Sequence, residues 1–168
     1  FYFQEREIPL ETVLSIDFFE RHPQAYWEWF HEIYHPVEPN GAHRALASLE
    51  AAGHLDAVIT QNIDGLHQRA GSRTVWELHG NWERLVCTQC GAVAALRDAV
   101  TVDGDPVPAC PSCGGQMRPD IVMYGESLDE AVIEAAVSAI ARASTLIVAG
   151  TSLVVYPAAG LINYFSGD

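Results

Sequence analysis

The sequence predicts an α/β fold built on a parallel sheet, and three observations support this. Apolar runs rich in β-branched residues at 55–59 and 145–149 are typical of short buried strands. A helical pattern precedes each run, at 42–52 and 127–142, which forms two αβ units. Polar residues follow both runs directly, and ligands of open α/β sheets bind at the carboxyl ends of strands.

Both helices have residues at their ends that commonly begin or end helices. Asn40 can cap the helix at 42–52, and Gly53 is suited to end it. Ser127 or Asp129 can cap the second helix, which is expected to reach Arg142. Each helix is therefore expected to lead into its strand through a short connection.

The segment before these units is expected to be mainly helical, with packed aromatic rings. Residues 1–9 show no clear period and are interpreted as a loop. Pro23 should stop one helix or start the next. Tyr26, Phe30 and Ile33 follow helical spacing, which favours a packed core over the lining of a cleft.

Polar side chains gather where two strands are expected to end. Gln61, Asn62 and Asp64 follow the first strand, and His79 follows a second short strand at 74–78. Two amides, a carboxylate and an imidazole at strand ends suit a polar ligand and a proton transfer. Taken singly, each could be a turn former or a structural histidine, because Asn and Asp often bond nearby backbone.

All four cysteines lie in two Cys-x-x-Cys pairs, Cys87 with Cys90 and Cys110 with Cys113, separated by nineteen residues. Glycine follows each pair, and the spacing fits a tetrahedral zinc ion held by four thiolates. Two disulfides would require an oxidising compartment, which nothing in the sequence indicates. Because four thiolates fill the coordination sphere, the zinc is expected to be structural rather than catalytic.

The chain is acidic, with a formal net charge of −13, and its nine basic residues are all arginine. Such a charge argues against a nucleic-acid surface, which needs clustered basic side chains. It suits a basic peptide partner, although solubility alone explains it equally well. No membrane span or secretory signal is recognisable, so a cytoplasmic location and no membrane partner are expected.

Five motifs in one order resemble the sirtuins (the Sir2 family), NAD-dependent protein-lysine deacylases, of which the bacterial and archaeal deacetylases are the most similar type. The motifs are Thr-Gln-Asn-Ile-Asp-Gly-Leu-His at 60–67, Glu-Leu-His-Gly at 77–80, the two cysteine pairs, Met-Tyr-Gly-Glu at 123–126 and Gly-Thr-Ser-Leu-Val-Val-Tyr-Pro at 150–157. The resemblance implies a Rossmann-like NAD-binding domain over 1–80 and 118–168, with a helical segment at 11–52. A zinc-binding module at 81–117 would be inserted into it.

The resemblance also implies a deacetylation in which NAD is a co-substrate and nicotinamide is released. His79 would be the general base on a ribose hydroxyl, with Asn62 and Asp64 as further catalytic residues. NAD would contact two strand-end loops, which comprise Gln61, Asn62, Ile63 and Asp64 and then Gly150, Thr151 and Ser152. An imidazole suits the role of base because such rings titrate close to neutral pH.

The acetylated-lysine peptide would be held as an added β-strand between two segments. These segments consist of Val122, Met123, Tyr124, Gly125 and Glu126 on one side and Val154, Val155 and Tyr156 on the other. Sirtuins that prefer succinyl or malonyl groups carry a Tyr-x-x-Arg pair, where this chain has Phe30 and Ile33. An acetyl or longer apolar acyl group is therefore favoured, because no cation is present to meet a carboxylate.

Two features of the sirtuin pattern are absent from this sequence. The glycine-rich first NAD loop and the late strand of the adenosine pocket have no counterpart here, which predicts an internal fragment of a longer protein. Two other functions stay open: a protein ADP-ribosyltransferase that uses NAD, and a non-catalytic reader of acylated peptides. A requirement for acyl peptide in nicotinamide release would distinguish the first, and the presence of a base beside polar strand-end residues argues against the second.

Overall fold

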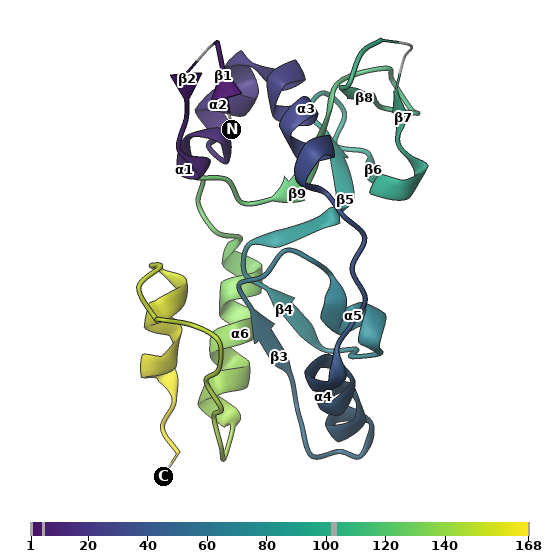
Figure 1. Cartoon of the computed structure of the whole chain (residues 1–168). Helices are drawn as coiled ribbons and strands as arrows, with labels where there is room; N and C mark the ends of the chain where they lie inside the picture. The colour runs from purple at the N-terminus through teal and green to yellow at the C-terminus, as the bar shows by residue number, and fades with distance from the viewer. Residues whose placement is uncertain (1, 5, 102–103, 168) are drawn as a thin grey trace. The chain divides into compact units, whose positions relative to one another are not determined.

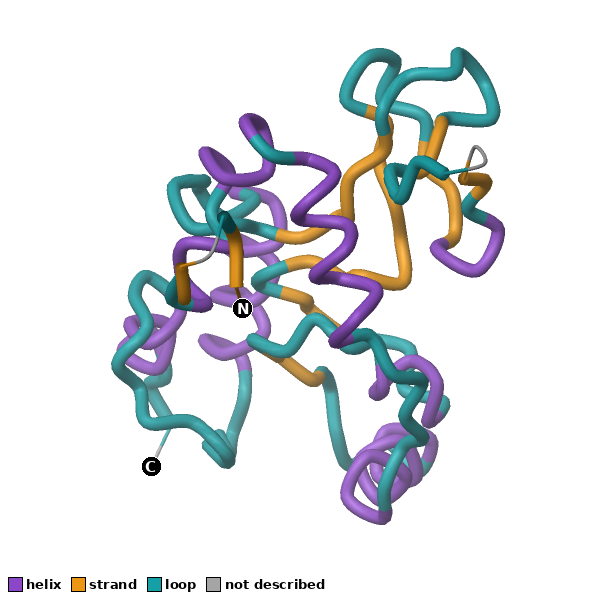
Figure 2. Tube along the Cα trace, turned by 45° about the horizontal axis from the view of Figure 1, so that its top comes forward, coloured by secondary structure: helices purple, strands orange, loops and turns teal. Residues whose placement is uncertain are grey.

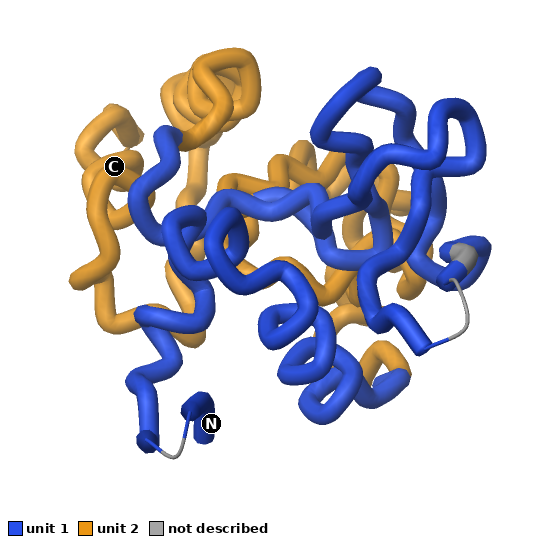
Figure 3. Tube along the Cα trace, turned by 90° about the horizontal axis from the view of Figure 1, so that it is seen from above, with its two compact units in different colours: residues 1–37, 80–127 blue, residues 38–79, 128–168 orange. Residues whose placement is uncertain are grey.

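The structure is a computed structural model of the chain, and it describes residues 2–4, 6–101 and 104–167. Contacts divide the chain into two compact units, residues 1–37 with 80–127 and residues 38–79 with 128–168 (Figure 3). The amino-terminal helices thus share a unit with the cysteine pairs, whereas the division into an NAD-binding domain and an 81–117 module stays a prediction. No helix among the described residues is long and apolar enough to cross a membrane.

The first unit opens with a short ribbon and three helices. The ribbon pairs β1 (Tyr2–Phe3) with β2 (Arg6–Glu7), so the expectation of a loop over 1–9 was wrong for these residues. Two residues per strand are too few to show periodicity in the sequence, and the backbone pairing forms them instead. The helices are α1 (Leu10–Val13), α2 (Ile16–Arg21) and α3 (Pro23–Ile33), with Pro23 in the first turn of α3 as expected.

Aromatic rings of α2 and α3 form the core of the first unit. Tyr26, Trp27, Trp29 and Phe30 are all buried, and the Phe19 and Tyr26 rings meet edge to face with centroids 5.1 Å apart. The interpretation of this segment as core is confirmed for the aromatic residues. Ile33, by contrast, is 40% exposed at the end of α3.

An antiparallel sheet with strand order β6-β5-β9 completes the first unit (Figure 1). Its strands are β5 (Gly80–Cys87), β6 (Val93–Ala95) and β9 (Met117–Ile121). The short helix η1 (Leu96–Asp98) and the pair β7 (Val100–Thr101) and β8 (Pro108–Ala109) lie between β6 and β9 in sequence. The central strand β5 ends at Cys87, and β9 leads directly into residues 122–126.

The second unit contains the parallel pair β3 (Val58–Thr60) and β4 (Val75–Glu77), in which Val58 lies opposite Val75. Its helices are α4 (Gly41–Ala51), α5 (Leu66–Ala70), α6 (Glu130–Arg142) and the 3-10 helix η2 (Ala158–Tyr164). Asn40 and Asp129 cap α4 and α6, as expected from the sequence. The buried core of this unit comprises Leu78, Ala136, Ile140, Ala158 and Leu161.

The expected buried strand at 145–149 does not form within the described chain. Residues 145–149 have no regular secondary structure, and Ile147 is 81% exposed. A strand needs a partner strand for its backbone, and the described parallel pair consists of β3 and β4 alone. The first strand is also shorter than expected, because it covers 58–60 instead of 55–59.

Candidate active site and metal centre

The polar residues that the sequence analysis selected around 60–80 lie at one edge of the parallel pair. Because β3 and β4 run in the same direction, the residues that follow them leave the pair at the same edge (Figures 1 and 2). The Leu78 N–H donates to the Thr60 carbonyl oxygen at 3.0 Å, which extends the pairing beyond β4. His79 and the loop after Thr60 are therefore brought together, although His79 is eighteen positions from Gln61 in the chain.

The ring of His79 is held by the backbone of that loop. Its Nδ1 atom lies 2.9 Å from the carbonyl oxygen of Gln61, in a half-buried position. A carbonyl oxygen can only accept, so Nδ1 carries the hydrogen and donates it. In the neutral ring, Nε2 then keeps its lone pair and can accept a proton.

Asp64 and Asn62 make local contacts in the same loop. The Leu66 N–H donates to Asp64 Oδ1 at 3.0 Å at the start of α5, and the Asn62 N–H donates to Thr60 Oγ1 at 3.0 Å. The Asn62 amide points its Nδ2 toward Asp64 Oδ2 at 3.5 Å, and the Asn62 side chain is exposed. Asp64 thus has the turn-forming contact that the sequence analysis weighed as the alternative, while its second oxygen lies beside Asn62.

The second predicted NAD loop, residues 150–152, lies in the same compact unit and is exposed. Gly150 has a positive φ of 68°, and a Cβ added there would meet no atom within 4 Å. Thr151 Oγ1 accepts a hydrogen bond from the Leu153 N–H at 3.1 Å, which forms a local turn. Val154, Val155 and Tyr156, expected to contact a peptide, are exposed side chains after this turn.

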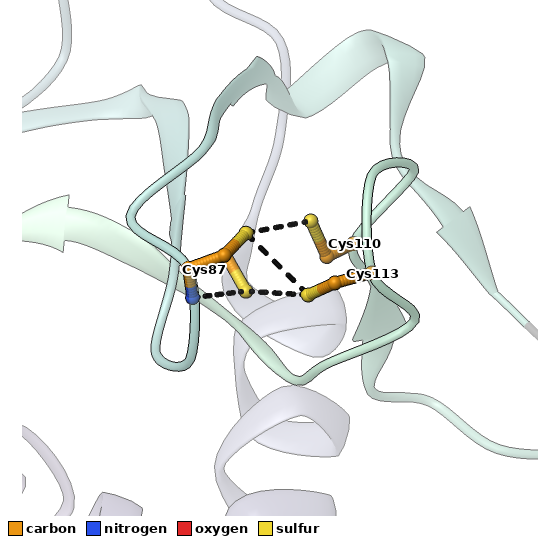
Figure 4. A group of neighbouring side chains, drawn as sticks. Cys87, Cys110 and Cys113 are labelled. Atoms are coloured by element: carbon orange, nitrogen blue, oxygen red, sulfur yellow. Dashed lines mark hydrogen bonds between the residues drawn. The ribbon is translucent and has the colours of Figure 1, made fainter.

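The four cysteines form one cluster at the end of β5, and none is in a disulfide. Their four sulfur atoms lie within 4.8 Å of one another, with Cys87 and Cys113 Sγ atoms 3.5 Å apart. Figure 4 shows Cys87, Cys110 and Cys113 with their sulfurs pointing toward a common centre. The cluster could hold a metal ion, which agrees with the zinc ligands predicted from the spacing.

The two Cys-x-x-Cys turns have the same backbone pattern. Each first cysteine accepts N–H···S contacts from the chain, from Gln89 and Cys90 to Cys87 and from Ser112 to Cys110. N–H groups of Cys90 and Gln89 that point at the sulfur lower the pKa of the Cys87 thiol to about 6. Backbone donors directed at a sulfur favour a thiolate, which is the form that binds a metal.

The segment 122–126, predicted to contact a peptide, follows β9 in the first unit. Its Met123 side chain is buried, whereas the Tyr124 side chain is 54% exposed. The backbone of Tyr124 is paired with the corner between α1 and α2: its N–H donates to the Leu14 carbonyl at 2.9 Å, and its carbonyl accepts from the Ile16 N–H at 3.0 Å. The corner between α1 and α2 therefore holds the backbone of this segment at Tyr124.

Glu126 is the partner of Arg118, a contact that the sequence analysis did not identify. Arg118 donates two hydrogen bonds of 2.7 Å to the two carboxylate oxygens, and the Met123 N–H donates to Oε2 at 2.9 Å. Partial burial acts to raise the pKa of Glu126, but the bonds from Arg118 and Met123 outweigh it and lower that pKa. A spacing of eight residues in the sequence gives no local signal that these two side chains meet.

The sequence profile of the Sir2 family matches residues 3–157. The chain belongs to the Sir2 family. Among curated relatives, the NAD-dependent protein deacetylase of Clostridium acetobutylicum is 49% identical over 162 residues, covering 95% of this chain and 66% of that protein. The NAD-dependent protein deacetylase of Thermotoga maritima is 45% identical, covering 90% of this chain and 63% of that protein.

Solved Sir2 structures have the same fold. One described as Sir2 bound to acetylated peptide is 44% identical with a TM-score of 0.84, covering 91% of this chain and 66% of that one. Another, described as Sir2 with p53 peptide and NAD+, is also 44% identical with a TM-score of 0.84, covering 95% and 68%. The predicted α/β, Rossmann-like class with a parallel sheet and a cysteine module is thereby confirmed, and the Sir2 chain described here spans 63–66% of the two curated relatives named above.

Proposed function

We propose that this protein is an NAD-dependent protein-lysine deacetylase. The observation that carries the proposal is the fixed ring of His79, whose Nδ1 is bonded to the Gln61 carbonyl while Nε2 keeps a lone pair. This is the arrangement that a general base requires, because one nitrogen orients the ring and the other accepts the proton. Relatives named NAD-dependent protein deacetylase, at 45–50% identity, support the same conclusion.

In this proposal His79 accepts a proton at Nε2 from a ribose hydroxyl of the co-substrate. The Gln61 carbonyl would then stabilise the positive charge on the ring, since hydrogen bonds to charged donors are stronger than neutral ones. When bound, NAD supplies the ribose carbon that receives the acyl oxygen as nicotinamide leaves. His79 is the proposed base, and Asn62 and Asp64 are the proposed polar residues beside the departing group.

The residues proposed to contact NAD have the character that a polar co-substrate requires. The Asn62 side chain is exposed at the strand edge, and the space around Gly150 leaves its backbone open to a ligand. The proposed contacts are Gln61, Asn62, Ile63 and Asp64 in one loop and Gly150, Thr151 and Ser152 in the other. Small and amide-bearing residues suit the ribose and amide groups of a dinucleotide.

The proposed second substrate is an acetylated-lysine peptide or protein, with no direct nucleic-acid or membrane partner. Its contacts would be residues 122–126 and 154–156, where the exposed side chains include Tyr124 and Tyr156. The net charge of −13 favours the basic sequences that surround many lysines. Phe30, buried in α3, and Ile33 offer no cation to an acidic acyl group, which favours an acetyl or a longer apolar acyl group.

Zinc is the metal that the four thiol ligands fit, and we propose that it is structural. Cys87, Cys90, Cys110 and Cys113 would fill a tetrahedral shell and leave no position for substrate. The four free thiols also suit a reducing compartment, so a cytoplasmic location belongs to the same proposal.

Nicotinamide release from NAD tests the proposal directly. The full-length protein is incubated with NAD, with and without an acetyl-lysine peptide, beside the same peptide carrying unmodified lysine. Release that requires the acetyl group, together with formation of the unmodified peptide, supports a deacetylase. Release without any acyl peptide would replace it with ADP-ribose transfer or NAD hydrolysis, and binding of the acetyl peptide without release would indicate a reader.

A further inference from the structure

We propose that Arg118 is a positioning residue that holds segment 122–126 in the shape that receives the acylated peptide. The inference rests on the proposed function for the role of the segment as a peptide site. The holding of the segment by Arg118 is a separate claim that can be measured without activity.

Arg118 closes the turn between the end of β9 and Glu126. Its Nη1 and Nη2 atoms donate to the two oxygens of Glu126 at 2.7 Å each, and Nη2 also donates to the Ile121 carbonyl oxygen at 2.9 Å. Glu126 Oε2 in turn accepts the Met123 N–H at 2.9 Å. One guanidinium thus connects the last residue of β9 with two residues of the segment, and its planar fork fixes their relative orientation.

The segment is held from its other side by the helical corner. Hydrogen bonds with Leu14 and Ile16 engage both the N–H and the carbonyl of Tyr124. Gly125 turns there with a φ of 95°, and an added Cβ would lie 3.2 Å from Ile16 Cγ2. The segment therefore has little freedom to change shape while Arg118 stays in place, and the exposed Tyr124 ring is presented outward.

The ion pair of Arg118 and Glu126 lies in a sheltered environment. The side chains of Arg118 and Glu126 are only 16% and 26% exposed, and the guanidinium lies over the Phe19 ring at 5.8 Å. Such sheltered pairs often add little net stability compared with apolar residues of the same size, but they restrict the arrangement of the groups they join. A positioning role, more than a stabilising one, is what this pair can supply.

The test compares Arg118→Gln and Arg118→Lys in the full-length protein with wild type and Arg84→Gln. Arg84 pairs with Asp120 at 2.9 Å in the same sheet, with both side chains 42% exposed, so its replacement removes an ion pair without touching the Glu126 contacts. Arg118→Lys keeps the charge and loses the bidentate fork, and it serves if Arg118→Gln fails to fold. Hydrogen exchange of the Met123 amide and steady-state kinetics with acetyl peptide and NAD are both measured.

Three results support the proposal together: faster exchange at Met123, a KM for peptide raised roughly tenfold, and a KM for NAD close to wild type in both Arg118 variants. Arg84→Gln should resemble wild type in all three. Unchanged exchange and unchanged peptide KM would overturn the proposal. An equal rise of both KM values with exchange accelerated throughout the unit would overturn it too, because the role would then be general stability.

The two claims fail in different ways. If wild type releases no nicotinamide with acetyl peptide, the proposed function fails, and the exchange of the Met123 amide still decides whether Arg118 holds the segment. If wild type is active and Arg118→Lys leaves peptide KM and exchange at wild-type values, the positioning role fails while the deacetylase assignment stands.

Discussion

The Nδ1 atom of His79 donates a hydrogen bond of 2.9 Å to the main-chain carbonyl oxygen of Gln61. The bond joins the residues that follow two parallel strands, and it determines which ring nitrogen is available for chemistry. The acceptor is a backbone carbonyl, so no side-chain substitution removes it. It lies beside His79 because β3 pairs with β4, and the orientation of the ring therefore depends on that pairing.

Replacement of His79 with Ala should abolish most of the proposed activity. Loss of a general base typically lowers the rate about 10²- to 10⁴-fold, and binding of the acetyl peptide should persist because His79 is not among its proposed contacts. The measurement is kcat for nicotinamide release alongside peptide binding by calorimetry. His54→Ala, at an exposed histidine of the same unit, is the control and should keep wild-type kcat. A His79→Ala variant with wild-type kcat would remove the base from the proposal.

Substitution of Cys110 with Ser should cost the protein its metal and lower its melting temperature. The Cys110 sulfur is one of four within 4.8 Å, and three thiolates hold zinc less strongly than four. Metal content by atomic emission and unfolding by calorimetry measure the two effects. Ser112→Ala changes the side chain between the ligands Cys110 and Cys113 and should bind one zinc ion per chain, like wild type. Full zinc content in Cys110→Ser, with an unchanged melting temperature, would refute the assignment.

Alanine at Gly80 should destabilise the protein more than alanine at Gly53. Both glycines have positive φ, 78° and 75°, so each substitution incurs the left-handed penalty of about 1–2 kcal/mol. At Gly80 the added Cβ would also lie 2.1 Å from the Asp120 carbonyl oxygen, whereas at Gly53 nothing lies within 4 Å. Free energies of unfolding from urea titrations give the comparison. Equal losses of unfolding free energy in the two variants would contradict this prediction, because β5 and β9 would then move apart at Gly80 at no cost in stability.

Stability should fall as the pH drops through the range in which histidine is protonated, and His67 should contribute to that fall. Burial first, and then the neighbouring His43 with ring centroids 4.7 Å away, lower the pKa of His67. The unfolded chain, with a histidine pKa of about 6.5, takes up the proton first, so this contribution is complete above that pH and is lost below it. Urea unfolding at pH 8 and at pH 5.5 measures the loss. His67→Gln should lose less stability than wild type over this interval, while His54→Gln should lose as much; equal losses in all three would contradict the role of His67.

Local sequence information was sufficient for several elements. Asn40 and Asp129 cap their helices through side-chain oxygens that accept from the next N–H groups, and such contacts depend only on neighbours in the chain. The cysteine cluster was also predictable, because a Cys-x-x-Cys turn brings its own two sulfurs together. In the helical segments, the periodicity of the sequence and the short-range capping hydrogen bonds favour the same structure, so the helices form there as expected.

The expectations that failed concerned strands. The run at 145–149 has the composition of a buried strand, yet Ile147 is largely exposed and the run has no partner strand among the described residues. Strand formation depends on long-range hydrogen bonds that composition does not encode. The short ribbon of β1 and β2 was missed for a different reason, since a strand of two residues leaves no period to recognise.

By itself, the sequence determined the helices α4 and α6 with their caps, the four metal-ligand candidates and the family to which the motifs point. Tertiary structure alone decided that His79 Nδ1 donates a hydrogen bond to the Gln61 carbonyl and that Arg118 forms an ion pair with Glu126. The physical reason is separation along the chain. Caps and cysteine turns are made by residues a few positions apart, whereas His79 is brought to Gln61 by strand pairing, and Arg118 reaches Glu126 only when the chain turns after β9.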